Sequence, residues 1–234
     1  MTWSTGIFAS TGNEVLGNDS GLAQLMGRIT GLPIASGPED KLSLLHLGLS
    51  ASALISGDST VRYRSRPESF LAPVQVDTHE IRAQGAVLIG LEAAIVRGPL
   101  SVQGEYIGTQ VARDHGPSVR FGGGYVSASY FMTGEIRPYD RSAGLFGRLK
   151  PLRPLSFRGD GWGAWELVAR YSSLDLDDRN IRGGTQKIVT LGTNWYWNPY
   201  VKLRFNYERA AIDLPRNDGD GRLHIFQGRF ELDF

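Results

Sequence analysis

Residues 186–210 read QKIVTLGTNWYWNPYVKLRFNYERA, and their alternation decides the fold class. Successive side chains of an extended chain point to opposite faces, so residues two apart share a face. The stretch therefore predicts two antiparallel strands joined by a tight turn, each with an apolar, aromatic face and a polar, charged face. The apolar faces comprise Val189, Leu191, Trp195 and Trp197 in the first strand, and Val201, Leu203, Phe205 and Tyr207 in the second.

The same alternation recurs along the whole chain, whereas helical periodicity is scarce. Glycine makes up 30 of the 234 residues and, with Pro, Asn and Asp, bounds the alternating runs. We therefore predict an all-β, antiparallel protein. Eleven strands are predicted, near residues 2–10, 23–32, 42–52, 60–66, 85–97, 100–112, 121–133, 163–175, 186–197, 200–210 and 222–234.

Two arrangements place the apolar faces differently. In a transmembrane barrel they contact lipid, and in a soluble β-sandwich they pack against each other. The predicted strands are longer than is usual in soluble sheets, and aromatic residues gather at their ends, for example at 195–200. Both features favour the barrel. The alternative is a soluble binding module that uses Trp195 and Trp197 as a ligand platform.

Composition excludes several functions. The chain has 25 Lys and Arg against 24 Asp and Glu, so no overall field attracts nucleic acid. Cysteine is absent, and the four histidines lack metal-ligand spacing, so no metal or cofactor is expected. No Ser–His pair or other catalytic set is identifiable, which indicates a protein that is not an enzyme.

The predicted connections fall into two classes. Those at 96–100 and 197–200 are tight turns, whereas the segments 33–41, 67–84, 113–120, 176–185 and 211–221 are longer and polar. Transmembrane barrels have short turns at one end and long loops at the other. The segment 134–161 falls at the end with the short turns but is too long for a turn. It forms either a twelfth strand or a segment folded into the lumen.

The C-terminal residues Phe230, Leu232 and Phe234 lie at alternate positions. They resemble the signal by which bacterial outer-membrane barrels are recognised by their assembly machinery.

Five blocks resemble the phosphate-selective porin O and P family: YRSRPE (63–68), YFMTGE (130–135), FGRLKP (146–151), GAWELVARYS (163–172) and LGTNWYWNP (191–199). Their order is similar to the C-terminal part of that family, from about Val61 onward. The resemblance implies a sixteen-stranded outer-membrane barrel, usually a homotrimer, that passes small inorganic anions through a lumen narrowed by inward-folded loops. The lysine-rich loop that the family uses to bind phosphate has no counterpart in residues 1–60, so a general porin with weak anion preference stays an alternative.

The main candidates for the anion path are Arg62, Arg64 and Arg66, which occupy every second position of VRYRSR (61–66). On a strand all three would project from one face and form a ladder along which a phosphate could pass. Arg82 is expected to extend this row, and family arginines in this region line the anion path. The opposing interpretation is that Glu68, Asp77 and Glu80 neutralise these arginines.

Other basic residues are weaker candidates for lining the pore. Arg170, Lys202 and Arg204 have lumen-facing parity, but Glu166 and Glu208 are close enough in sequence to neutralise them. Arg148 and Lys150, with Arg153, lie in the segment 134–161 and would form a second basic constriction if that segment enters the lumen.

Length sets a last expectation. Sixteen strands at about 21 residues each need roughly 340 residues. We therefore expect one barrel domain over residues 1–234 that is N-terminally incomplete, with a smaller closed barrel as the alternative.

Overall fold

The chain forms one long antiparallel sheet. The computed structural model describes residues 1–13, 17–37, 42–213 and 221–233. Among these residues no helix has the length and apolarity needed to cross a membrane. The sheet has ten strands, β1 (Thr2–Asn13), β2 (Gly17–Ser36), β3 (Ser43–Val61), β6 (Ile81–Arg97), β7 (Leu100–Arg113), β8 (Val119–Phe131), β11 (Ala164–Asp178), β12 (Ile181–Tyr196), β13 (Val201–Asp213) and β14 (Gly221–Leu232), in this order. The prediction of an all-β antiparallel fold is confirmed.

The predicted strand at 60–66 is wrong. Strand β3 continues to Val61, and the chain then leaves the sheet and returns at Ile81. Between them lie only two short strands, β4 (Arg64–Ser65) and β5 (Val76–Asp77), which pair with each other. The described residues therefore form one sheet of ten strands, where eleven or twelve strands were expected.

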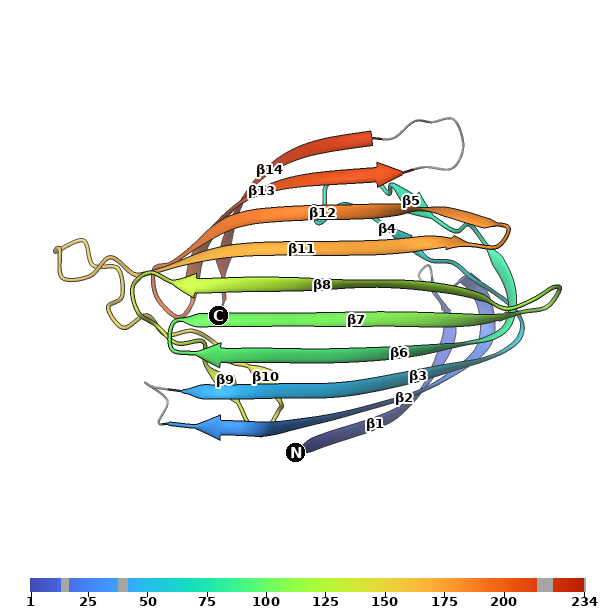
Figure 1. Ribbon diagram of the computed structural model, residues 1–234, viewed down its shortest axis with the longest axis horizontal. Coiled ribbons are helices and arrows are strands. Elements are labelled where there is room, and N and C mark those ends of the chain that lie inside the picture. The colour runs from blue at the N-terminus through green and yellow to red at the C-terminus, as the bar shows by residue number, and fades with distance from the viewer. Residues whose placement is uncertain (14–16, 38–41, 214–220, 234) are drawn as a thin grey trace.

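The sheet curves into a trough, with β1 at one edge and β14 at the other (Figure 1). The apolar side chains predicted from alternation lie on its convex outer face, where Leu91, Val189 and Phe205 are each about half exposed. No second sheet covers this outer face within the part of the chain that the structure describes. In a soluble sandwich such side chains would be packed against another sheet, so that alternative is not supported.

Two ends of the trough can be distinguished. The turns at Gly98–Pro99 and Trp197–Tyr200 lie at one end, which we call the turn end, together with the segment 132–163. The segment 62–80 and the connections 114–118 and 179–180 lie at the other, which we call the loop end. The segment 33–41 was expected among the long loops. Strand β2 instead runs to Ser36 and β3 begins at Ser43, and both of these strand ends lie at the turn end.

The segment 134–161 contributes no strand to the sheet. It contains a hairpin of β9 (Tyr139–Asp140) and β10 (Leu145–Phe146), which lies on the concave side. Tyr139 and Phe146 pack there against Leu44 and Val96 of the sheet. Of the two arrangements considered for this segment, the structure supports the inward-folded one. Figure 1 shows both short hairpins behind the sheet.

Aromatic side chains gather on the outer face at the turn end. Trp165 and Trp195 stack with their ring centroids 5.0 Å apart, Trp197 lies 5.3 Å from Trp195, and Phe230 lies 6.3 Å from Trp197. The four come from neighbouring strands and the turn that follows β12. Such a band is typical of the membrane interface of a transmembrane sheet. Phe230 and Leu232, from the expected assembly signal, are exposed on this face, and Phe234 lies outside the described residues.

Candidate functional site

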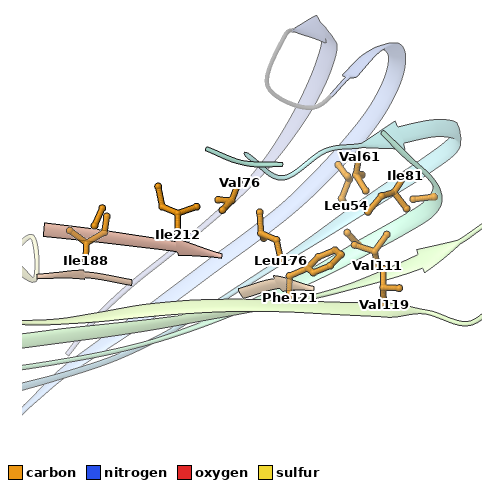
Figure 2. Packing of buried hydrophobic residues seen from close by; sticks show 13 residues of the cluster. Leu54, Val61, Val76, Ile81, Val111, Val119, Phe121, Leu176, Ile188 and Ile212 are labelled. Atoms are coloured by element: carbon orange, nitrogen blue, oxygen red, sulfur yellow. The ribbon is translucent and has the colours of Figure 1, made fainter. Parts of the chain in front are cut away.

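The segment 62–80 is folded back over the concave face at the loop end. Its Val76 is fully buried in an apolar cluster with sheet residues that include Phe121, Leu176 and Ile188 (Figure 2). Tyr63 adds a hydrogen bond to Thr109, with 3.1 Å between the two hydroxyl oxygens. Burial of these apolar groups stabilises the segment inside the trough rather than in solvent.

The carboxylate of Glu68 anchors the tip of this segment to the opposite side of the trough. Glu68 Oε1 accepts hydrogen bonds from Arg170 Nε and Ser172 Oγ, each at 2.8 Å, and Glu68 Oε2 accepts one from Thr190 Oγ1 at 2.9 Å. Gln227 Nε2 donates to the Glu68 carbonyl at 3.4 Å. Glu68 thus ties the segment to β11, β12 and β14, and the segment crosses the trough.

The three candidate arginines lie on this segment, but they do not form a ladder on one strand. Arg62 makes a two-pronged contact with Asp77, with Arg62 Nε 2.8 Å from Asp77 Oδ1. This hydrogen bond is the main cause that lowers the pKa of Asp77. The charge of Arg62 is therefore balanced locally, as the opposing interpretation expected for Asp77.

Arg64 and Arg66 are different, because both are exposed and neither has a carboxylate partner within the described residues. Arg66 donates to the Phe70 carbonyl at 2.7 Å and lies over the Phe70 ring. It also lines a cavity of about 570 Å³ between the segment and the sheet. Glu105 and the Glu68–Arg170 pair line the same cavity.

Arg82 does not join these arginines. On β6 it alternates with the buried residues Ile81 and Ala83, which face the apolar cluster under the segment. Its exposed side chain therefore lies on the opposite face of the sheet. The structure does not place Arg82 in the row that was expected to continue from Arg62.

The second inward segment is held on the opposite side of the trough. Tyr139 Oη lies 2.6 Å from His46 Nδ1, and Arg28 donates to the Gly144 carbonyl at 3.3 Å. Glu92 pairs with Arg28 at 2.6 Å. These contacts tie the β9–β10 hairpin to β2, β3 and β6.

Sequence analysis missed Arg137, which lies just before this hairpin. Arg137 pairs with Glu166, a fully buried carboxylate of β11 that also accepts hydrogen bonds from Asn194 and Tyr196, each at 2.8 Å. A buried carboxylate requires a positive partner, so the inward parity of Glu166 was the available signal. It could not have identified which cation fills that role.

The weaker pore candidates are largely paired. Arg170 pairs with Glu68 at 2.8 Å, and Lys202 and Arg204 pair with Glu231 at 2.6 and 3.1 Å. The expected partners, Glu166 and Glu208, are not the ones used. Arg148 lies 3.7 Å from Asp233 and over the Tyr200 ring, beside a cavity of about 200 Å³ that Arg137, Lys202 and Arg204 also line. Lys150 and Arg153 are exposed at the turn end.

The concave face therefore carries many charges, most of them paired across strands. Such a surface is wet and polar, and its balance of charge depends on the few groups without an opposite partner. Arg64 and Arg66 are two such cations near the loop end, and Glu105 is a carboxylate for which no ion pair is found among the described residues.

Comparison with known proteins gives consistent matches. A family model described as phosphate-selective porin O and P matches residues 1–234. An uncharacterized protein of Caulobacter vibrioides is 34% identical over 198 residues, covering 81% of this chain and 39% of that protein. Porin O of Pseudomonas aeruginosa is 32% identical over 143 residues, covering 56% of this chain and 31% of that protein. In both cases the match covers less than two fifths of the relative's own length.

Proposed function

Because this chain belongs to the phosphate-selective porin O and P family, we propose that it forms part of a pore through which small anions diffuse passively. This is a family of outer-membrane porins, not of enzymes. Membership confirms the predictions made from sequence for the family, the location and the absence of enzymatic activity. The pore, its anions and its assembly are the proposal.

The observation that carries the proposal is the seated segment 62–80. It crosses the polar side of the trough, is fixed there by Glu68, and presents Arg64 and Arg66 without carboxylate partners in the described part of the chain. Fixed positive charge beside a water-filled path lowers the barrier for anions and raises it for cations. Arg62 contributes less because Asp77 balances its charge.

Phosphate is the finer part of the proposal. A guanidinium group can bind two oxygens of a phosphate at once, and the two free arginines lie close in sequence. Glu105 weakens the positive field of the cavity that it shares with Arg66. A general porin with weak anion preference is therefore the second candidate, and the outcome depends on how far Glu105 offsets Arg64 and Arg66.

We also propose how this open sheet becomes part of a closed barrel. The two edges of the sheet are β1 and β14, and the curated relatives are much longer than the matched region. We propose that these ten strands are the C-terminal part of a longer barrel of the sixteen-stranded kind that assembles as a homotrimer. Phe230 and Leu232, on the outer face of the last strand, would act with Phe234 as the signal for the assembly machinery.

The test is the reversal potential of single pores under a KCl gradient. Arg64→Ala with Arg66→Ala should shift it toward cations, and Glu105→Gln should shift it toward anions, because each change removes one sign of charge from the path. Arg82→Ala is the matched control, since its side chain lies on the outer face. If Arg82→Ala shifts the potential as far as the double variant does, the segment does not set the selectivity.

Phosphate preference is tested separately, by the block of chloride current on addition of phosphate. A phosphate-selective pore should show a block that the double variant loses. A general porin should show none in either form.

A further inference from the structure

The outer face changes character at the loop end of the last three strands. Toward the turn end this face carries apolar and aromatic side chains, but near the loops it carries Lys187 on β12, Arg209 on β13 and Arg222 on β14, all exposed. These three residues are called the outward basic cluster. They lie on the face opposite the lumen and play no part in the proposed anion path.

The register places the three cations around one small side chain. Ala211 lies directly opposite Lys187 on one side and Arg222 on the other, and Arg209 is two residues before Ala211 on the same face. Neighbouring strands are about 4.8 Å apart, so Lys187 and Arg222 flank Ala211 across roughly 10 Å. Arg209 lies diagonally to both, within reach of long side chains. The short methyl group leaves the space between the three cations open.

The cluster is not neutralised by the protein in the described residues. None of the ion pairs found there involves Lys187, Arg209 or Arg222. Asp175 lies on the same face of the neighbouring strand β11, and its Oδ1 accepts a hydrogen bond from the Asp177 amide.

An apolar surface begins directly beside the cluster. Arg209 is opposite Val189 on one side and His224 on the other. A hydrogen bond of 2.8 Å joins His224 Nδ1 and Tyr207 Oη. Tyr207 in turn packs on Phe226, with ring centroids 5.0 Å apart. A few residues further along each strand, the outer face therefore changes from three cations to aromatic and aliphatic groups. A ligand that matches both parts has an anionic head and an apolar tail.

We propose that the outward basic cluster binds the phosphate group of a membrane lipid whose acyl chains lie along Val189, Tyr207 and Phe226. The two arginines can each offer a bidentate fork to phosphate, and Lys187 adds a point charge. The turn end of β11, β12 and β14 carries Trp165, Trp195 and Phe230 in place of cations, so the site belongs to one leaflet. The proposal rests on the outer-membrane placement but not on anion passage.

The test is lipid binding to the protein in detergent, measured by native mass spectrometry with bis-phosphorylated lipid A and with phosphatidylcholine. Lipid A should bind preferentially. Changing Lys187, Arg209 and Arg222 to Gln should weaken its binding about a hundredfold, roughly fivefold for each cation near an anionic surface. Arg97→Gln with Arg141→Gln and Arg158→Gln removes the same charge from exposed positions at the turn end and should leave lipid A binding unchanged.

Several results would overturn the proposal. Lipid A binding that survives the triple change would do so, as would full displacement of lipid by excess inorganic phosphate, which would indicate a site for free phosphate. A change in oligomeric state without a change in lipid binding would assign the cluster to a contact between copies. Arg222→Gln alone, expected to cost about fivefold, serves if the triple variant does not fold. Pore selectivity should be unchanged in the Lys187, Arg209 and Arg222 variants, whose side chains lie on the outer face, so failure here is distinguishable from failure of the pore proposal.

Discussion

Replacing Glu68 by Gln should release the tip of the segment 62–80 from the opposite side of the trough. The carboxylate accepts one hydrogen bond from a guanidinium group and two from hydroxyl groups. A bond to a charged group contributes about 1.5–3 kcal/mol and a neutral one about 0.5–1.5 kcal/mol. Gln keeps the volume and one acceptor oxygen, so the change removes the charged bond and part of the rest.

Partial exposure places the expected loss at the lower end of this range. The side chains of Glu68 and Arg170 are 23% and 33% exposed, so solvent screens their attraction. We take about 2 kcal/mol, which corresponds to a roughly thirtyfold rise in the ratio of released to seated segment. Single-channel recording should show this as more frequent transitions to a larger conductance, because the segment then obstructs the lumen less.

The matched control is Glu105→Gln. It removes the same charge from the same cavity, and among the described residues no hydrogen bond or ion pair joins the Glu105 side chain to the segment. This variant should change ion selectivity without adding conductance transitions. Equal transition rates in Glu68→Gln and the unmodified protein would refute the role of Glu68 as an anchor, and equal rates in both variants would attribute the effect to charge alone.

Two further predictions concern the pH dependence of anion preference and the cost of placing a charge on each face of the sheet. Because hydrogen bonding to Arg62 lowers the pKa of Asp77, the pair is intact above the usual value of about 3.9 and is lost only as the pH falls through the lowered pKa. Asp77→Asn should therefore raise anion preference at neutral pH, and this difference from the unmodified pore should persist until strong acid removes the charge of Asp77. The measurement is the reversal potential of both pores, and a difference between them that disappears already in mild acid would contradict this prediction. Leu191→Arg on the outer face should lower the free energy of unfolding in vesicles by about 2–4 kcal/mol. Gln103→Arg on the lumen face should cost much less, as measured by urea titration.

Periodicity in the sequence identified the strands where they face lipid and misjudged where they end. The runs predicted at 163–175 and 186–197 match β11 and β12 to within one residue at the turn end. Both strands continue at the loop end through the polar stretch around Asp177 and Arg182, which pair with each other. Alternation of apolar and polar residues marks only the part of a strand that has an apolar environment on one face. Beyond that band the backbone pairing continues, and side-chain polarity no longer reports it.

The error at 60–66 has a different cause. Arg62, Tyr63 and Arg64 alternate as a strand does, yet the segment leaves the sheet after Val61. Its position is decided by Glu68 and its partners Arg170 and Thr190, which lie more than a hundred residues further along the chain. No local pattern carries that information, because the contacts exist only after the wall has curved. The same holds for the pairing of Arg137 with Glu166.

The two inward segments also constrain the order of assembly. The segment 62–80 is made early in the chain, but its anchors lie 102 to 159 residues later, on β11, β12 and β14. The β9–β10 hairpin reaches back instead, with Tyr139 bonded to His46 across 93 residues. Contacts of such sequence separation form late, because the entropy of closing the intervening chain must first be offset by the pairing of neighbouring strands. We therefore expect the strands of the sheet to pair first, around an unobstructed interior. The segment 62–80 should reach its final position only after the C-terminal hairpin has formed.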